Sequence, residues 1–283
     1  MRTTRWPLFA LALCGFVHAE DAAAIMAKVA ANQDRAQQMR SAFVYHQSVL
    51  IRFQRGNGKL AREEQREYTV TPTAASFAKE LTHFAGKYEN HGQYIDYDKP
   101  GYEYKDVDID GELANDMASD LVNDNTRDGL ARDVFPLTTK ELPKYTFRLG
   151  GKENYRGVEV FKITFKPKKR TALDPETGDE SSWAGEALID AREFQPVLVT
   201  TWLAQGVPVA VQVLLGTNLK HLGFKVAYKK FDEGLWFPVT YGGEFQVRAL
   251  FLYKRTIALS MVNSGFQRAD VSSVVSFGLP VIP

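Results

Sequence analysis

Apolar and polar positions alternate along most of the chain between Trp183 and Tyr253, which is the pattern of β-strands rather than of helices. The run 207–215 is the most apolar part of this stretch, and its positions divide between two faces by the period of two. One face carries Val207, Val209, Val211, Val213 and Leu215, and the other carries Pro208, Ala210, Gln212 and Leu214. A strand with one face in water alternates more cleanly. We therefore expect both faces to be covered, one by the protein core and the other by a helix or an apolar ligand.

Turn sequences separate the apolar runs about every ten residues, which favours a β-sandwich or barrel over alternating strands and helices. Nearer the N-terminus, Phe43–Phe53 and Leu60–Val70 are typical of two strands joined by a hairpin at Gly56-Asn57-Gly58. The second of these strands is highly charged, so we expect it at an edge of the sheet. The segment 76–88 is compatible with a strand or a helix.

Two segments show the three- and four-residue spacing of amphipathic helices. The first, Glu20–Arg40, carries Ile25 and Val29 on its apolar stripe, and Asp21 is placed to cap it. We expect this helix to pack across the sheet. The second segment, 112–135, predicts two short helices divided near 123–125, which would cover the sheet as a lid.

The first residues have the pattern of a secretory signal peptide and do not enter the fold. Arg2 and Arg5 form a positive region, 6–17 is apolar but too short to span a bilayer, and a small-residue cleavage site ends at Ala19. We predict a signal peptide over 1–19, cleavage after Ala19, and a single domain over 20–283 in the periplasm. The one cysteine, Cys14, lies within the peptide, and whether it is lipidated stays open.

Composition narrows the functional classes only slightly. The chain has 283 residues, of which 45% are hydrophobic and 24% are charged, as in an ordinary globular protein. A formal net charge of +1 gives no sign of the basic surface that nucleic-acid binding requires. We therefore expect no nucleic-acid partner.

Candidate chemistry is sparse. Asp106, Asp108 and Asp110, followed by glycine, match the first half of a calcium loop, but Met117 stands where the bidentate glutamate belongs. Acids at the start of a helix produce the same pattern, so calcium binding stays open. The histidines lack metal-site spacing, and neither a nucleophile motif nor a phosphate-binding loop occurs. We predict no catalytic residues, no metal and no cofactor.

Four tyrosines could stack on a sugar or base, or pair across strands, namely Tyr94, Tyr97, Tyr102 and Tyr104.

The order of several short motifs resembles the LolA-like family of outer-membrane lipoprotein carriers and sorting proteins. The motifs are turns into strands and strand ends, at 90–97 (NHGQYIDY), 157–167 (GVEVFKITFKP), 187–190 (ALID), 194–197 (FQPV) and 234–238 (GLWFP). The resemblance implies a mainly β fold with helices (α+β), an antiparallel incomplete β-barrel closed by the N-terminal helix and the helical insert. It also implies an apolar cavity for acyl chains, and no catalysis. In this family an arginine lies near the cavity, and Arg52 stands on a suitable early strand.

Taken together, these observations predict a non-catalytic periplasmic carrier for lipid acyl chains or lipidated proteins, which would exchange cargo with membrane-associated donor and acceptor proteins. The alternatives are a periplasmic sensor or structural module that binds a partner protein, and a hydrolase that acts through carboxylates. The residues predicted to line the hydrophobic cavity are Ile25, Val29, Arg52, Val199, Val209, Val211, Val213, Phe245 and Val247.

Overall fold

The computed structural model describes residues 21–73, 77–122, 137–168, 183–204, 217–220, 223–231, 234–249 and 253–269. The predictions for 1–19, for the strand 207–215 and for the second helix of the insert fall outside the described residues. In chain order the elements are α1 (Ala22–Arg40), β1 (Phe43–Arg55), β2 (Leu60–Pro72), β3 (Phe77–Asn90), β4 (Gln93–Tyr97), α2 (Ile109–Val122), the 3-10 turn η2 (Leu142–Lys144), β5 (Tyr145–Tyr155), β6 (Val158–Pro167), β7 (Trp183–Asp190), β8 (Pro196–Leu203), β9 (Thr217–Lys220), β10 (Gly223–Lys230), β11 (Trp236–Ala249) and β12 (Tyr253–Arg268).

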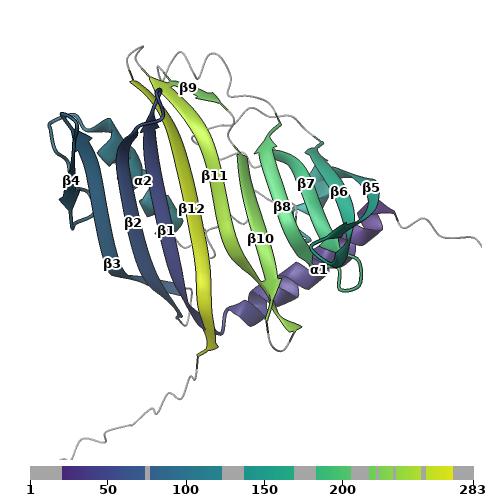
Figure 1. The fold of residues 1–283 in the computed structure, drawn as a ribbon. Coiled ribbons are helices and arrows are strands. Elements are labelled where there is room, and N and C mark those ends of the chain that lie inside the picture. Colours follow the sequence, from purple (N-terminus) through teal and green to yellow (C-terminus); the bar gives the residue numbers. More distant parts are fainter. Residues whose placement is uncertain are drawn as a thin grey trace, which may run out of the picture.

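The described strands form one open antiparallel sheet (Figure 1). Its order is β4-β3-β2-β1-β12-β11-β10-β8-β7-β6-β5, with β9 paired to β11 beside this order. Most neighbours are joined by hairpins, and β12 returns to lie against β1 with Phe53 opposite Ile257. The two ends of the order do not meet, so the sheet is not closed. The predicted fold class, a mainly β protein with an incomplete barrel, is confirmed.

The prediction that the charged second strand lies at an edge is wrong. β2 pairs with β1 on one side and with β3 on the other, and the ambiguous segment 76–88 supplies β3. The charges of β2 were misleading because three of them are buried rather than exposed to solvent. Arg62, Glu64 and Arg66 are 0%, 1% and 5% exposed. Their positions, two residues apart, put them on the same face of the strand.

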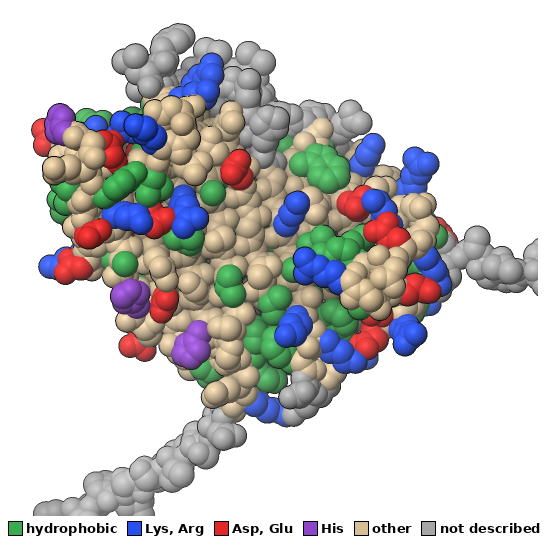
Figure 2. All heavy atoms as spheres, viewed as in Figure 1, with side chains coloured by type: hydrophobic (Ala, Val, Ile, Leu, Met, Phe, Trp, Pro, Cys, Tyr) green, Lys and Arg blue, Asp and Glu red, His purple; other side chains and the backbone are tan. Residues whose placement is uncertain are grey.

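Both helices lie on the same face of the sheet, behind it in Figure 1, and we call this the covered face. α1 packs over the β5–β8 half, and α2 packs over β1, β2, β11 and β12. The opposite, outer face is shown in Figure 2, where charged side chains are sparse over its middle. Among the described helices, none is long and apolar enough to cross a membrane.

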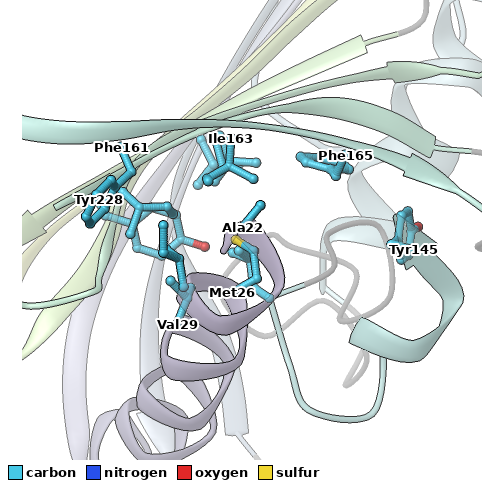
Figure 3. Close-up of a cluster of buried hydrophobic side chains, with 14 of the residues drawn as sticks. Ala22, Met26, Val29, Tyr145, Phe161, Ile163, Phe165 and Tyr228 are labelled. Atoms are coloured by element: carbon cyan, nitrogen blue, oxygen red, sulfur yellow. The ribbon is translucent and has the colours of Figure 1, made fainter. Parts of the chain in front are cut away.

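Apolar side chains under α1 form the largest of three core clusters among the described residues, the α1 cluster; the smallest contains Ala36, Leu235 and Phe237. Met26 and Val29 of the helix point toward Phe161, Ile163 and other residues of the sheet (Figure 3). The second, the α2 cluster, contains Ile51, Phe53, Ile257 and Met261 from the sheet, with Ala114 and Ala118 from α2. Each helix thus covers its own part of the apolar face.

Polar side chains fix α1 to the turn between β7 and β8. Asn32 Nδ2 donates to the carbonyl oxygen of Glu193 at 2.9 Å, and Gln33 Nε2 donates to Gln195 Oε1 at 2.6 Å. Asp190 Oδ1 holds the turn by accepting from the backbone N–H groups of residues 192 and 193, both at 2.8 Å. Asn32, which interrupts the apolar stripe of the helix in the sequence, is therefore an anchoring residue.

Glu193 links the same turn to β10 and β11, and this link makes stability depend on pH. Its carboxylate accepts from Lys230 Nζ at 2.5 Å and from Trp236 Nε1 at 2.9 Å, and these bonds lower the pKa of Glu193. A lowered carboxyl pKa contributes stability above the unfolded-state value of about 4.3 that is lost as the pH falls below it.

We expect Glu193→Gln to lower the free energy of unfolding at pH 7 by less than about 1 kcal/mol, because solvent screens this half-exposed ion pair. Thermal unfolding of the unchanged protein and of the variant, measured between pH 7 and pH 3, gives the difference in their stability. The difference between them should shrink as the pH drops below about 4. A difference that stays constant with pH would assign the effect to packing instead of charge.

Candidate functional site

The covered face brings five of the predicted cavity residues into or against the α1 and α2 clusters. Ile25, Val29 and Val199 lie in the α1 cluster and are 0–1% exposed. Val247 is buried in the α2 cluster, and Phe245 packs against that cluster while half-buried. The predicted residues therefore share one face of the sheet, but they divide between the two helices.

Arg52 is not among them. Its strand neighbours Ile51 and Phe53 are buried on the covered face, while its own side chain is 49% exposed and pairs with Glu63. Successive side chains on a strand point to opposite faces, so Arg52 belongs to the outer face. The structure does not bring it together with the other candidates. Val209, Val211 and Val213 lie outside the described residues.

Three half-buried aromatic side chains lie on the covered face where the two clusters meet, and we call them the seam: Phe224 beside the α1 cluster, Phe245 beside the α2 cluster, and Tyr241. Tyr241 packs against both clusters. Its ring stacks on that of Phe224 with centroids 5.2 Å apart, and Phe224 in turn contacts Trp183 at 5.5 Å. The two clusters thus form one continuous apolar face whose central part is less deeply buried than either side.

The seam is apolar and carries no charge. Burial raises the pKa of Tyr241 well above the usual range of a phenol, so its hydroxyl stays neutral at any physiological pH. An uncharged aromatic surface of this kind suits an apolar ligand rather than an ionic one.

Gly243 makes the close packing of the seam possible. A Cβ at this position would lie 2.5 Å from the carbonyl oxygen of Gly223 and 2.7 Å from the ring of Phe224. The missing side chain lets the Phe224 ring lie flat over β11. Gly242, the preceding residue, faces the outer side, where a Cβ would come no closer than 3.3 Å to backbone.

We expect Gly243→Ala to destabilise the protein by about 1–3 kcal/mol, because an added methyl group overpacks a site bounded by backbone. Gly242→Ala is the matched control on the same strand and should cost less. Urea unfolding monitored by tryptophan fluorescence compares them. Equal losses from both variants would contradict the tight packing assigned to the seam.

The N-terminus of α2 is held by six charged side chains, which we call the ionic cluster: Arg62, Glu64, Arg66, Asp108, Asp110 and Arg255. Asp108 Oδ1 caps the helix by accepting from the backbone N–H of Gly111 at 3.1 Å. Its Oδ2 accepts from Arg62 Nη1 at 2.9 Å. Asp110 Oδ1 accepts from Tyr253 Oη at 2.6 Å and from Arg255 Nε at 3.0 Å. Two acidic residues, two positions apart, therefore clamp the first turn of α2 onto β2 and β12.

This arrangement explains the aspartates that resemble half a calcium loop. Asp108 and Asp110 bind arginines, and Asp106 is exposed. Across the described ranges, no three His, Cys, Asp or Glu side chains are grouped so that they could hold a metal ion. Three carboxylates face three arginines in the ionic cluster, so each carboxylate is neutralised by a neighbour. The cluster has the character of a structural clamp.

The tyrosines stack on one another beside the ionic cluster. Tyr88 stacks on Tyr104 at 4.5 Å, and Tyr97 stacks on Tyr102 at 4.9 Å. Tyr97 Oη donates to Glu64 Oε1 at 2.7 Å and accepts from Arg62 Nε at 2.8 Å. Burial, together with the negative charge of Glu64, raises the pKa of Tyr97. Tyr97 also pairs across the strands with Tyr88, in line with the pairing alternative, whereas Tyr102 is 39% exposed at the surface. Tyr94, the remaining predicted tyrosine, is 54% exposed and does not belong to these stacks.

Sequence reasoning missed the ionic cluster and part of the seam. A usable signal for the cluster was present, because Arg62, Glu64 and Arg66 alternate as strictly as apolar residues do on a buried strand face. Phe224 and Tyr241 stand in strands that the pattern did predict. The sequence pattern could not predict that these two residues lie where the α1 and α2 clusters meet.

Comparison with known proteins finds similarities to solved structures. No protein-family model matches the chain, and no curated protein matches it. Among solved structures, a DUF1329 family protein from Desulfovibrio piger is 12% identical with a TM-score of 0.39, over 90% of this chain and 96% of that one. A putative outer membrane lipoprotein-sorting protein domain from Vibrio parahaemolyticus is 9% identical with a TM-score of 0.37, over 88% and 95%.

A LolA superfamily protein from Nitrosomonas europaea is 12% identical with a TM-score of 0.34, over 89% of this chain and 96% of that one. Solved structures of the LolA superfamily are among those to which this chain is similar.

Proposed function

We propose that this protein is a non-catalytic binding or carrier protein for the acyl chains of lipids or lipidated proteins, exported to the periplasm after cleavage behind Ala19. The observation that carries the proposal is the seam. Phe224 and Tyr241 stack on each other where the two helix-covered apolar clusters meet, Phe245 lies further along β11 on the same face, and all three uncharged side chains are half-buried. An acyl chain laid along the seam would extend the apolar core and complete its burial.

Burial of an acyl chain can supply the free energy of binding at such a site without hydrogen bonds or ion pairs. An acyl chain of about 14 methylene groups leaving water gains about 11 kcal/mol before other costs, at about 0.8 kcal/mol for each methylene. Ordering of the chain and loss of its free motion offset a large part of this gain. The remainder is enough for useful binding.

The two helices differ in how they would respond to a ligand. α1 buries large side chains and is tied to the β7–β8 turn by Asn32 and Gln33. Among the α2 side chains that the structure describes, the fully buried apolar ones are the small Ala114 and Ala118, with Leu113 and Met117 packed around them. The first turn of α2 is bound to β2 and β12. We propose that α2 is the cover that shifts when an acyl chain enters, pivoting on the ionic cluster.

A chain-length series tests this proposal. The purified protein is titrated with a fluorescent fatty acid, which unlabelled saturated fatty acids of increasing length then displace. Each added methylene should tighten binding about fourfold until the seam is filled, after which the affinity levels off. Displacement that does not depend on chain length would contradict an acyl-chain site.

The second candidate, a module that binds a partner protein, is favoured by a different part of the molecule. A section of the sheet edge at β3 lacks a partner strand among the described residues. The two functions are compatible, since the edge and the seam are built from different residues.

A further inference from the structure

Part of β3 is an open edge of the sheet. β3 spans Phe77–Asn90, but β4 pairs only with residues 86–90. Residues 80–85 have β2 on one side and, in the part of the chain that the structure describes, no strand on the other. The outward N–H and C=O groups of an edge strand are a template on which another strand can pair.

A hollow of about 530 Å³ lies at this edge, where β4 ends. It is lined by Phe84, Ala85, Gly86, Asp96, Tyr97 and Asp98. The rings of Phe84 and Tyr97, with centroids 5.7 Å apart, give the hollow an apolar part. The two aspartates give it a negative part.

The two carboxylates of the hollow have no ion-pair partner among the described residues. Lys87 stands opposite Asp96 in the strand register, yet its Nζ binds Glu63 Oε1 at 2.8 Å instead. Both aspartates are exposed. The arginines of the neighbouring ionic cluster do not compensate them, because each of those arginines is engaged by its own carboxylate. The hollow therefore favours a cationic group.

We propose that this edge binds an extended segment of a partner protein by strand addition, with a lysine or arginine side chain of that segment in the hollow. Antiparallel pairing with β3 would make the segment run in the same direction as β4. Its N-terminal end would then lie next to Asp96 and Asp98, so the basic residue stands at the start of the segment. The proposal does not rest on the acyl-chain site, because no residue of the hollow belongs to the seam or to either apolar cluster.

A synthetic peptide of alternating threonine and valine with two N-terminal lysines and a C-terminal fluorophore tests the proposal by fluorescence anisotropy. Two further peptides separate its parts. One has glutamine in place of both lysines, and the other carries N-methyl groups on alternate backbone nitrogens, which prevents strand pairing without changing any side chain. The full chain is used throughout.

Asp96→Asn/Asp98→Asn should weaken binding of the lysine peptide about five- to tenfold and remove its advantage over the glutamine peptide. Glu112→Gln/Asp116→Asn, which removes two exposed charges on α2, is the charge-matched control and should leave binding unchanged. The N-methylated peptide should not bind.

The proposal is overturned if that peptide binds as well as the parent, if the control variant weakens binding equally, or if no lysine peptide binds. It is also overturned if this edge pairs with the same edge of a second copy of the protein. Sedimentation would then show a dimer that the parent peptide dissociates and the N-methylated peptide leaves intact.

Discussion

Replacing Arg62 by methionine should lower the free energy of unfolding by about 3–5 kcal/mol, because it leaves buried carboxylates without their counter-charge. Arg62 is 0% exposed and contacts Asp108, Tyr97 and the backbone carbonyl of Tyr102. Methionine fills much of the volume, so the loss reports on charge and hydrogen bonding more than on a cavity. Guanidinium unfolding followed by tryptophan fluorescence measures it.

Arg52→Met is the matched control for this experiment. Arg52 stands on the neighbouring strand and also pairs with a glutamate, but its side chain is 49% exposed. An exposed pair contributes less than about 1 kcal/mol. Adding Asp108→Asn to Arg62→Met should recover part of the loss, because asparagine still caps α2 and no longer needs a cation. Equal effects at positions 62 and 52 would show that the ionic cluster does not clamp α2.

Phe245→Glu should weaken binding of a long-chain fatty acid at least about tenfold. The carboxylate would replace apolar contacts with roughly two methylene groups, each worth about 0.8 kcal/mol, and would also repel the fatty-acid headgroup. The side chain is half-buried and packs at the margin of the α2 cluster, so the variant is expected to fold. Displacement of a fluorescent fatty acid gives the affinities.

The adjacent residue supplies the control for this variant. Gln246 is exposed on the outer face of the same strand, so Gln246→Glu adds the same charge without touching the seam. Its fatty-acid affinity should equal that of the unchanged protein. If both substitutions weaken binding equally, the ligand is responding to net charge, and the seam is not its site.

The periodicity of the chain predicts most of the fold because burial follows directly from the side-chain pattern. The strand at Phe43–Phe53, the N-terminal helix with Ile25 and Val29, and the first helix of the insert all appear where the apolar spacing places them. The turn at His91-Gly92 appears as well, with positive φ at both residues. Local sequence suffices wherever one face of an element meets the core.

The prediction failed where a buried face is built from charges. β2 has the composition of an edge strand, but Arg62, Glu64 and Arg66 are buried because Asp108 and Tyr97, far away in the sequence, supply their partners. Such a network is decided by tertiary pairing, which a single strand does not reveal. The candidate site has the same limitation. Strand periodicity finds Phe245 and Val247, but it does not show that Tyr241 lies where the α1 cluster meets the α2 cluster, since that depends on tertiary packing.

The most direct test of the acyl-chain proposal is native mass spectrometry of the purified mature protein, followed by solvent extraction of whatever has bound. We predict a species heavier than the polypeptide alone by the mass of one acyl lipid, which extraction releases and Phe245→Glu reduces. A mass equal to the polypeptide alone, together with no uptake of added fatty acid, would contradict the proposal and leave protein binding as the function to pursue.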